Sequence, residues 1–257
     1  MAIRCCNSLF LTHRRQFRSG LESDMKHTLF TALAALLVTA FPAMAQQGQA
    51  PSTNVAWTID TLNLVRSGNA EEGARLNSDL ACASCHGDSG QSSNDAWPSL
   101  SGQRPGYIFK VLKDYQDGKL SGTSRGQLMA YVVEEMTDQN MADLAAFFAA
   151  NALPPAREGT APDMAEGLDL LGDPKRLIPP CSACHGTRAQ GDFPDYPALA
   201  GQSPEFLARA LEDFRTGRRS NDVYSRMRLI SARLTDEEIA ALATYFSTRG
   251  TTAPDGE

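Results

Sequence analysis

Apolar residues recur every three to four positions in several segments of the chain, a spacing that predicts amphipathic helices. Two of these segments, 136–148 and 234–246, share the same arrangement of apolar and polar residues. Thr137 and Thr235 stand where each helix would begin, and threonine is a favourable N-cap residue. Neither half of the sequence shows the alternation of apolar and polar residues that predicts a strand. The pattern therefore predicts an all-α fold.

Glycines and the same apolar spacing delimit four more helices, which are expected at about 70–80, 106–117, 164–171 and 205–216. Gly118 and Gly217 follow the second and fourth of them, where a left-handed residue often ends a helix. The first and third contain Gly73 and Gly167. We expect these two glycines to allow close contact with the helix that closes each half.

The sequence also contains an internal repeat. The segment WPSLSGQRPGY at 97–107 matches YPALAGQSPEF at 196–206, with an offset of 99 residues. A stretch rich in proline, alanine and glycine, 151–163, separates the two copies and is typical of a linker. We therefore predict two tandem domains of similar construction, 46–153 and 154–257.

The first 45 residues differ in character from the rest of the chain. From Met25, a short basic stretch is followed by an apolar run over 29–41 and by Ala-Met-Ala at 43–45, the three-part pattern of a secretory signal peptide. A transmembrane helix is the alternative, but the run is shorter than the ~20 apolar residues that span a bilayer. Residues 1–45 are thus predicted to be a targeting region that is cleaved after Ala45, which places the mature chain in the periplasm.

Cysteine and histidine are confined to two short motifs once this region is set aside. The cysteines and histidines after residue 45 all lie in CASCHG at 82–87 and CSACHG at 181–186. A disulfide framework is one interpretation in an exported chain. Structural zinc would need four ligands per site, and each motif supplies only three neighbouring candidates. A thioredoxin-like dithiol would need a βαβ context, which the helical pattern lacks.

The histidine that directly follows the second cysteine decides between these interpretations. Cys-x-x-Cys-His is the attachment motif of c-type haem, in which both thiols bond to one porphyrin and the histidine binds its iron. We therefore predict two covalently bound haem c groups. The attachment residues would be Cys82, Cys85, Cys181 and Cys184, with His86 and His185 as axial ligands of the iron.

The second axial ligand of each iron is predicted to be methionine, because no histidine or cysteine is left over. Met227 is the only methionine beyond the second motif, whereas the first half offers several. The repeat resolves the choice, since Met227 aligns with Met129, each in an expected loop before the closing helix. Met136 and Met141 align with leucine and isoleucine and are expected in the core, as is Met164.

Together these residues resemble the dihaem cytochrome c4 family, whose members consist of two fused class I cytochrome c domains. The resemblance rests on the two Cys-x-x-Cys-His-Gly motifs, on PSLSGQ and PALAGQ, and on a methionine followed by the closing helix. It covers nearly all of the chain after residue 45, and it implies a few helices wrapped around each haem. It also implies that the carbonyls of Pro98 and Pro197 accept a hydrogen bond from the axial histidines, and that the haem edges and propionates meet near the domain interface.

For function, the resemblance implies a periplasmic electron-transfer protein of a respiratory chain. Such a protein carries single electrons from a bc1-type complex or a dehydrogenase to a terminal oxidase. Its partners would be redox proteins, any membrane association would be made through them, and no small-molecule substrate is expected. The alternative is the cytochrome subunit of a flavin- or quinone-linked dehydrogenase, for example of the sulfide dehydrogenase type.

Composition and charge limit other functions. The chain has a net charge of −6 and no basic stripe, which argues against binding to nucleic acid. A haem enzyme would need an open iron position with acid or base groups beside it, and no distal histidine or cysteine ligand remains, so we expect no enzymatic activity. Five arginines lie between 218 and 233, around Met227, while acidic residues follow Met129. This difference predicts that the two haem edges face different partners.

Overall fold

The computed structural model describes residues 57–250 of the chain. Within that range the backbone forms helices and loops, with isolated β-bridges but no sheet. This confirms the predicted all-α class. The predicted targeting region, 1–45, lies outside the described residues. None of the helices formed by residues 57–250 combines the length and the apolar character that a membrane crossing requires.

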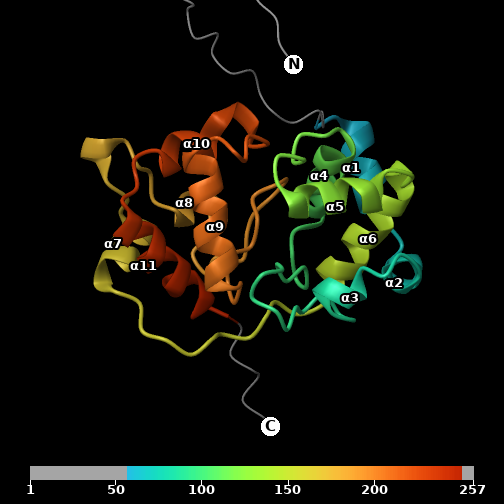
Figure 1. Cartoon of the computed structure of the whole chain (residues 1–257), viewed down its shortest axis with the longest axis horizontal. Helices are drawn as coiled ribbons and strands as arrows, with labels where there is room; N and C mark the ends of the chain where they lie inside the picture. Colours follow the sequence, from blue (N-terminus) through green and yellow to red (C-terminus); the bar gives the residue numbers. More distant parts are fainter. Residues whose placement is uncertain (1–56, 251–257) are drawn as a thin grey trace, which may run out of the picture. The chain divides into compact units, whose positions relative to one another are not determined.

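The N-terminal half of the described chain, coloured blue to yellow-green in Figure 1, consists of helices α1 to α6 and the loops between them. α6 packs against α1, α2 and α4, and α5 packs against α4. The predicted first, second and closing helices of this half correspond to α2, α4 and α6. The helices are α1 (Ile59–Arg66), α2 (Ala70–Asp79), α3 (Ala83–His86), α4 (Pro105–Gln116), α5 (Ser124–Val133) and α6 (Asp138–Ala150).

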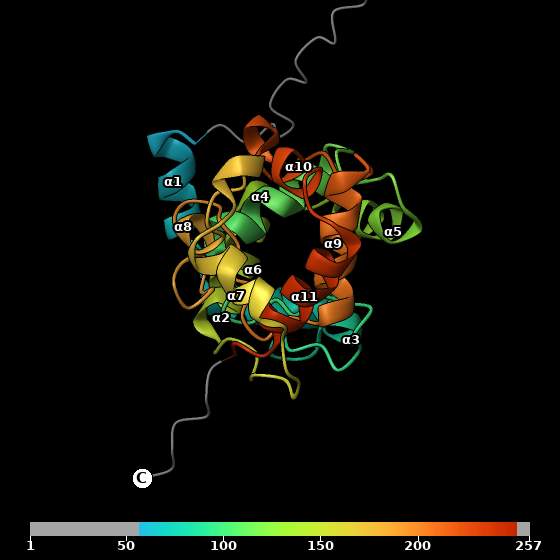
Figure 2. The same cartoon turned by 90° about the vertical axis from the view of Figure 1, so that its left-hand side faces the viewer.

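The C-terminal half, coloured yellow to red in Figure 1, repeats the order of α2 to α6 with two added 3-10 turns, η1 and η2, and its described residues form no counterpart of α1. α11 packs against α7 and α9, and α10 packs against α9. Figure 2 shows α7 and α11 next to each other. The elements are α7 (Asp163–Leu170), η1 (Pro174–Arg176), α8 (Ser182–His185), α9 (Pro204–Arg215), η2 (Val223–Ser225), α10 (Arg226–Ser231) and α11 (Asp236–Ser247).

Capping interactions set the helix ends that the sequence predicts. The Thr137 side chain accepts a hydrogen bond from the backbone N–H of Asn140, whose side chain accepts one from the backbone N–H of Thr137. Thr235 and Glu238 form the same reciprocal pair at the start of α11. The glycines that follow α4 and α9 have φ of 72° and 75°, a conformation that glycine adopts with little strain. The predicted start and stop signals are therefore confirmed.

Gly73 and Gly167 differ in their surroundings, although the sequence predicts the same role for both. A Cβ atom on Gly73 would lie 2.1 Å from the carbonyl oxygen of Asp143 and 2.6 Å from Cβ of Phe147, so glycine is what lets α2 approach α6. A Cβ atom on Gly167 would have nothing within 4 Å. The prediction for Gly167 is wrong because α7 reaches its core through other positions, such as the fully buried Ala165.

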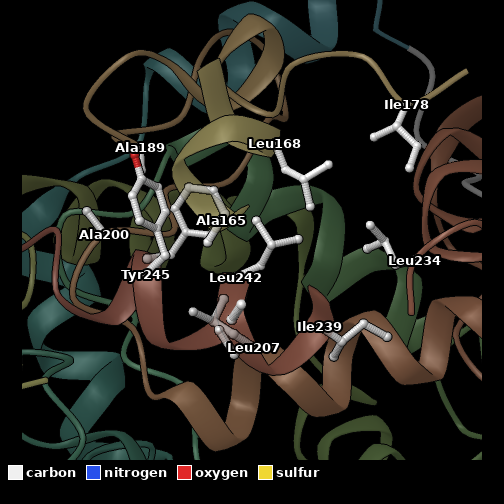
Figure 3. Close-up of a cluster of buried hydrophobic side chains, with 13 residues drawn as sticks. Ala165, Leu168, Ile178, Ala189, Ala200, Leu207, Leu234, Ile239, Leu242 and Tyr245 are labelled. Atoms are coloured by element: carbon white, nitrogen blue, oxygen red, sulfur yellow. The ribbon is translucent and has the colours of Figure 1, made fainter. Parts of the chain in front are cut away.

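Each half has its own hydrophobic core. In the C-terminal half, Leu207 of α9 and Leu242 of α11 point toward a common cluster that α7 also enters (Figure 3). In the N-terminal half, Met141 is fully buried and Met136 nearly so, which confirms that both are core residues. Met164 is 46% exposed, so the prediction that it packs in the core is wrong. It lies in the first turn of α7, outside the buried face of that helix.

Candidate haem sites

Each Cys-x-x-Cys-His motif forms one short helix, α3 in the first half and α8 in the second. The chain turns directly after each histidine, where Gly87 and Gly186 have φ of 82° and 81°. A Cβ atom on Gly87 would lie 2.1 Å from the carbonyl oxygen of Gln91, which explains why glycine follows the histidine. All four cysteines of the two motifs are free thiols, so the disulfide interpretation is not supported.

The electrostatics of the thiols differ from those of a redox dithiol. Burial raises the pKa of the Cys82 thiol, and burial together with the charge of Asp169 raises the pKa of Cys181 to about 12. Reactive dithiols have lowered pKa values and carry a thiolate. Residues 57–250 also contain no group of three or more His, Cys, Asp or Glu side chains arranged to hold a metal ion. The dithiol and zinc interpretations therefore find no support in the described part of the chain.

Matching hydrogen bonds orient the two histidines. Nδ1 of His86 lies 2.8 Å from the carbonyl oxygen of Pro98, and Nδ1 of His185 lies 2.9 Å from that of Pro197. Because a carbonyl oxygen only accepts, Nδ1 carries the proton and Nε2 keeps its lone pair. Both histidines are 7% exposed, and burial lowers the pKa of each. Each imidazole is therefore neutral, the form that ligates a metal ion.

Met129 and Met227 lie on helices, in α5 and α10, and the prediction that they lie in loops is wrong. The apolar pattern gave no sign of these helices for two reasons. α10 is only six residues long. α5 exposes large apolar side chains, such as those of Leu128 and Tyr131, and so lacks a single buried stripe. Both methionines are partly buried, and both line the cavity described next.

Both motif histidines, both methionines and three of the four motif cysteines line one continuous cavity of about 800 Å³, and Cys85 is the cysteine that does not contribute to its lining. Leu144 and Phe148 of α6 contribute to its apolar wall in the N-terminal half, and Leu242 and Phe246 of α11 do so in the C-terminal half. The volume lies within the range of cofactor sites. Cysteine thiols, imidazoles whose Nε2 keeps its lone pair, and thioether side chains beside an apolar cavity fit covalently attached haem c at both motifs.

The cavity wall also contains a buried ionic cluster that joins the two halves. Lys110 is 4% exposed, and its Nζ lies 2.5 Å from Oδ2 of Asp114. Lys110 also donates a hydrogen bond to the backbone carbonyl of Asn221 from the other half, and Nδ2 of Asn221 donates to Asp114 at 2.8 Å. Sequence reasoning missed this cluster, because a lysine and an aspartate four residues apart on a helix usually form a solvated pair.

The arginines around Met227 make internal contacts. Arg228 is 8% exposed and donates to Asp222 at 2.6 Å. Arg219 donates to the hydroxyl of Tyr107 in the other half at 3.0 Å and lies over the ring of Phe214. Arg219 and Arg228 are therefore engaged in contacts within the molecule, and neither supports the predicted difference between the partners of the two haem edges.

An all-α chain with two Cys-x-x-Cys-His sites on one apolar cavity has the features of a c-type cytochrome. The family model for cytochrome c matches residues 70–151 and 175–249. Cytochrome c4 of Thiocapsa roseopersicina is 37% identical to this chain over 170 residues, which cover 64% of this chain and 84% of that protein. Reduced recombinant cytochrome c4 from Pseudomonas stutzeri has a similar structure, with a TM-score of 0.62 and 30% identity, covering 71% of this chain and 99% of that one.

A third relative is named as a thiosulfate dehydrogenase electron acceptor, from Stutzerimonas stutzeri strain A1501. It is 35% identical over 172 residues, which cover 66% of this chain and 80% of that protein. By these matches the chain belongs to the cytochrome c family and, within it, to the dihaem cytochrome c4 proteins. It is an electron-transfer cytochrome with two covalently bound haem c groups.

Proposed function

We propose that this cytochrome carries single electrons between redox proteins in the periplasm, from a bc1-type complex or a dehydrogenase to a terminal oxidase. The observation that carries the proposal is the pair of Cys-x-x-Cys-His sites on one continuous cavity. Haem c supplies a one-electron Fe(III)/Fe(II) couple when it is attached at such a site. Two such couples in one chain suit a carrier that accepts an electron at one site and delivers it from the other.

Each haem c would be held by three kinds of residue: a histidine, a methionine and two cysteines. His86 and His185 would bind iron through Nε2, and Met129 and Met227 would each supply a second protein ligand. Histidine and methionine together are the axial set of electron-transfer cytochromes and raise the reduction potential. The tethers are the thiols of Cys82, Cys85, Cys181 and Cys184.

The carbonyl oxygens of Pro98 and Pro197 complete each site. By accepting a hydrogen bond from Nδ1–H of the histidine, each carbonyl fixes the tautomer and the ring plane, and it makes the imidazole a stronger donor to iron. The apolar walls exclude water from the cavity. A site built in this way keeps its geometry when the charge of the iron changes, which suits rapid electron transfer.

We further propose that the chain is a carrier without a substrate of its own. Outside the two motifs the sequence after residue 45 offers no histidine that could act as an acid or base beside the iron. Export to the periplasm follows from the signal-peptide pattern that ends at Ala45.

The second candidate function is that of a permanent or dedicated electron acceptor for a dehydrogenase. One observation favours it: a relative that is 35% identical over 172 residues is named as a thiosulfate dehydrogenase electron acceptor. The chemistry at the haem sites is the same in both candidates, and the partner differs. Rapid-mixing experiments that compare reduction by a purified thiosulfate dehydrogenase and by a bc1-type complex would separate the two candidates.

The experiment that tests the haem sites uses the exported holoprotein. We expect its mass to show cleavage after Ala45 and two attached haem groups. Met129→Ala and Met227→Ala should each remove about half of the absorbance band that reports methionine bound to Fe(III), because each removes one of two equivalent ligands. Met136→Leu is the matched control, since Met136 also lines the cavity but aligns with a leucine in the repeat. An unchanged band in either alanine variant would refute that ligand, and a mass with fewer than two haems would refute the proposal.

A further inference from the structure

Two buried glutamines reach across from one half of the molecule to the other. Gln103 stands just before α4, and Gln202 stands just before α9 at the equivalent position of the repeat. Each is 5% exposed. The proline-to-glutamine segments PSLSGQ and PALAGQ therefore supply more than the carbonyl that holds each histidine.

Each glutamine side chain makes two hydrogen bonds to the backbone of one residue in the other half. Nε2 of Gln202 donates to the carbonyl oxygen of Ser99 at 2.9 Å, and its Oε1 accepts from the N–H of Ser99 at 2.8 Å. Gln103 makes the same pair of bonds to Ala198, at 3.0 and 2.7 Å. All four bonds are buried, so the loss of one partner would leave an unsatisfied backbone group.

The contacted residues directly follow the prolines that hold the histidines. The N–H of Ser99 and the carbonyl of Pro98 belong to one planar peptide group. That peptide group therefore accepts a hydrogen bond from Nδ1 of His86 on one side and donates one to Gln202 on the other. The corresponding chain of contacts in the second site runs from the histidine through Pro197 to Gln103 of the first half.

We propose that Gln103 and Gln202 are positioning residues that act crosswise, each setting the reduction potential of the haem in the opposite half through the peptide group that holds its histidine. The inference rests on the proposed role of the two histidines as iron ligands. Hydrogen bonds in a chain polarise one another, so a peptide whose N–H is bonded has a carbonyl that accepts more strongly. A stronger acceptor at Nδ1 gives a more electron-rich imidazole, which favours Fe(III) over Fe(II).

The direction of the effect follows from this chain of contacts. Gln202→Leu removes both hydrogen bonds to Ser99 while keeping an apolar side chain that branches one atom earlier than the amide. It should raise the potential of the haem attached in the N-terminal half and leave the other nearly unchanged. Gln103→Leu should do the reverse. We expect the Fe(II)/Fe(III) ratio of the affected haem at a fixed potential to rise about threefold to tenfold, where tenfold corresponds to about 59 mV.

The experiment compares the two leucine variants as holoproteins, and each serves as the matched control for the other. NMR titration over a range of potentials resolves the haems, which are assigned to their halves through contacts with the rings of Phe148 or Phe246 in the cavity wall. Amide hydrogen exchange supplies a second readout: exchange should accelerate at Ser99 in Gln202→Leu and at Ala198 in Gln103→Leu.

A further control separates the crosswise effect from a general loosening of the contact between the halves. Arg157 forms an ion pair with Asp95 across the halves, and its side chain donates no hydrogen bond to either histidine-bonded peptide. Arg157→Ala should leave both potentials unchanged. If the leucine variants fail to take up two haems, Gln202→Asn and Gln103→Asn provide the same comparison, because asparagine keeps the amide but shortens its reach by one methylene.

Three results would overturn the inference. Both potentials could shift equally, or only the haem in the glutamine's own half could shift. The third is that hydrogen exchange accelerates while both potentials stay unchanged. A failure of the proposed function has a different signature. It would appear as a mass with fewer than two haems or as an iron that keeps its spectrum when the histidine of its motif is replaced.

Discussion

Replacing Gly73 with alanine tests the closest contact between helices in the N-terminal half. The added Cβ would lie 2.1 Å from a carbonyl oxygen of α6 and 2.6 Å from Cβ of Phe147, whereas real Cβ contacts below 3.0 Å essentially do not occur. Because the nearest atom belongs to the backbone, no side-chain rotation relieves the overlap. α2 and α6 would have to separate by about 1 Å in a close-packed interior.

The expected change in stability combines two opposing effects. Overpacking of this kind costs about 1–3 kcal/mol. Alanine has a higher helix propensity than glycine, and this difference stabilises the variant by up to about 1 kcal/mol. We therefore expect Gly73→Ala to lower the free energy of unfolding by about 1–2 kcal/mol. Gly167→Ala is the matched control, since its Cβ meets no atom within 4 Å, and it should stabilise the protein by about 0.5–1 kcal/mol.

The assay should follow the two halves separately, because a chain with two domains need not unfold in one step. Urea unfolding of the holoprotein gives the overall stability, and native-state hydrogen exchange gives the local stability of α2 and α7. Gly73→Ala should accelerate exchange in α2, whereas Gly167→Ala should slow it in α7. If both substitutions change stability in the same direction, the difference in packing between the two halves is refuted.

Two ionised contacts give further predictions. The Arg176 side chain hydrogen-bonds Glu238 and lowers its pKa below the ordinary value of 4.5, so the stability from this contact is present above about pH 4.5 and is lost as the pH falls through the lowered pKa. Glu238→Gln should therefore flatten the acid side of a plot of urea midpoint against pH, and an unchanged slope would contradict this reasoning. Lys110→Met should destabilise the protein by about 3–5 kcal/mol because it leaves the buried Asp114 charge without its lysine. The double variant with Asp114→Leu should recover most of that loss in the same urea assay, and an equal loss in both variants would argue against it.

The parts of the molecule that could be predicted from the sequence are those determined by neighbouring residues. The haem motifs occupy a few consecutive positions, so their chemistry can be recognised without knowledge of the fold. The capping boxes at Thr137 and Thr235 span four residues, and the helices they start have long apolar stripes. The carbonyl acceptors at Pro98 and Pro197 lie 12 residues from their histidines and required the resemblance to a family.

The features that escaped prediction depend on contacts between distant residues or on short helices. α5 and α10 have no continuous buried stripe, so the periodicity gave no sign of them. Gly167 lies in the helix that corresponds to that of the packed Gly73 but faces open space, because the packing of two helices is not encoded in either helix alone. Lys110 and Asn221 lie 111 positions apart in the sequence and meet only because the two halves are in contact.

The internal repeat explains why some contacts between the halves come in pairs. When two similar domains face each other, a contact from one position to a second tends to recur in reverse, as at the interface of a symmetric dimer. Gln103 and Gln202 follow this rule. Gln202 binds Ser99, and Gln103 binds Ala198, which is the residue equivalent to Ser99 in the repeat. The charged residues break it. Lys110 is buried and paired with Asp114, whereas its counterpart in the repeat, Arg209, is partly exposed and donates to the backbone of Ala96. The glutamines therefore impose the same control on both histidines, and the charged contacts are the part of the structure that makes the two haem sites electrostatically different.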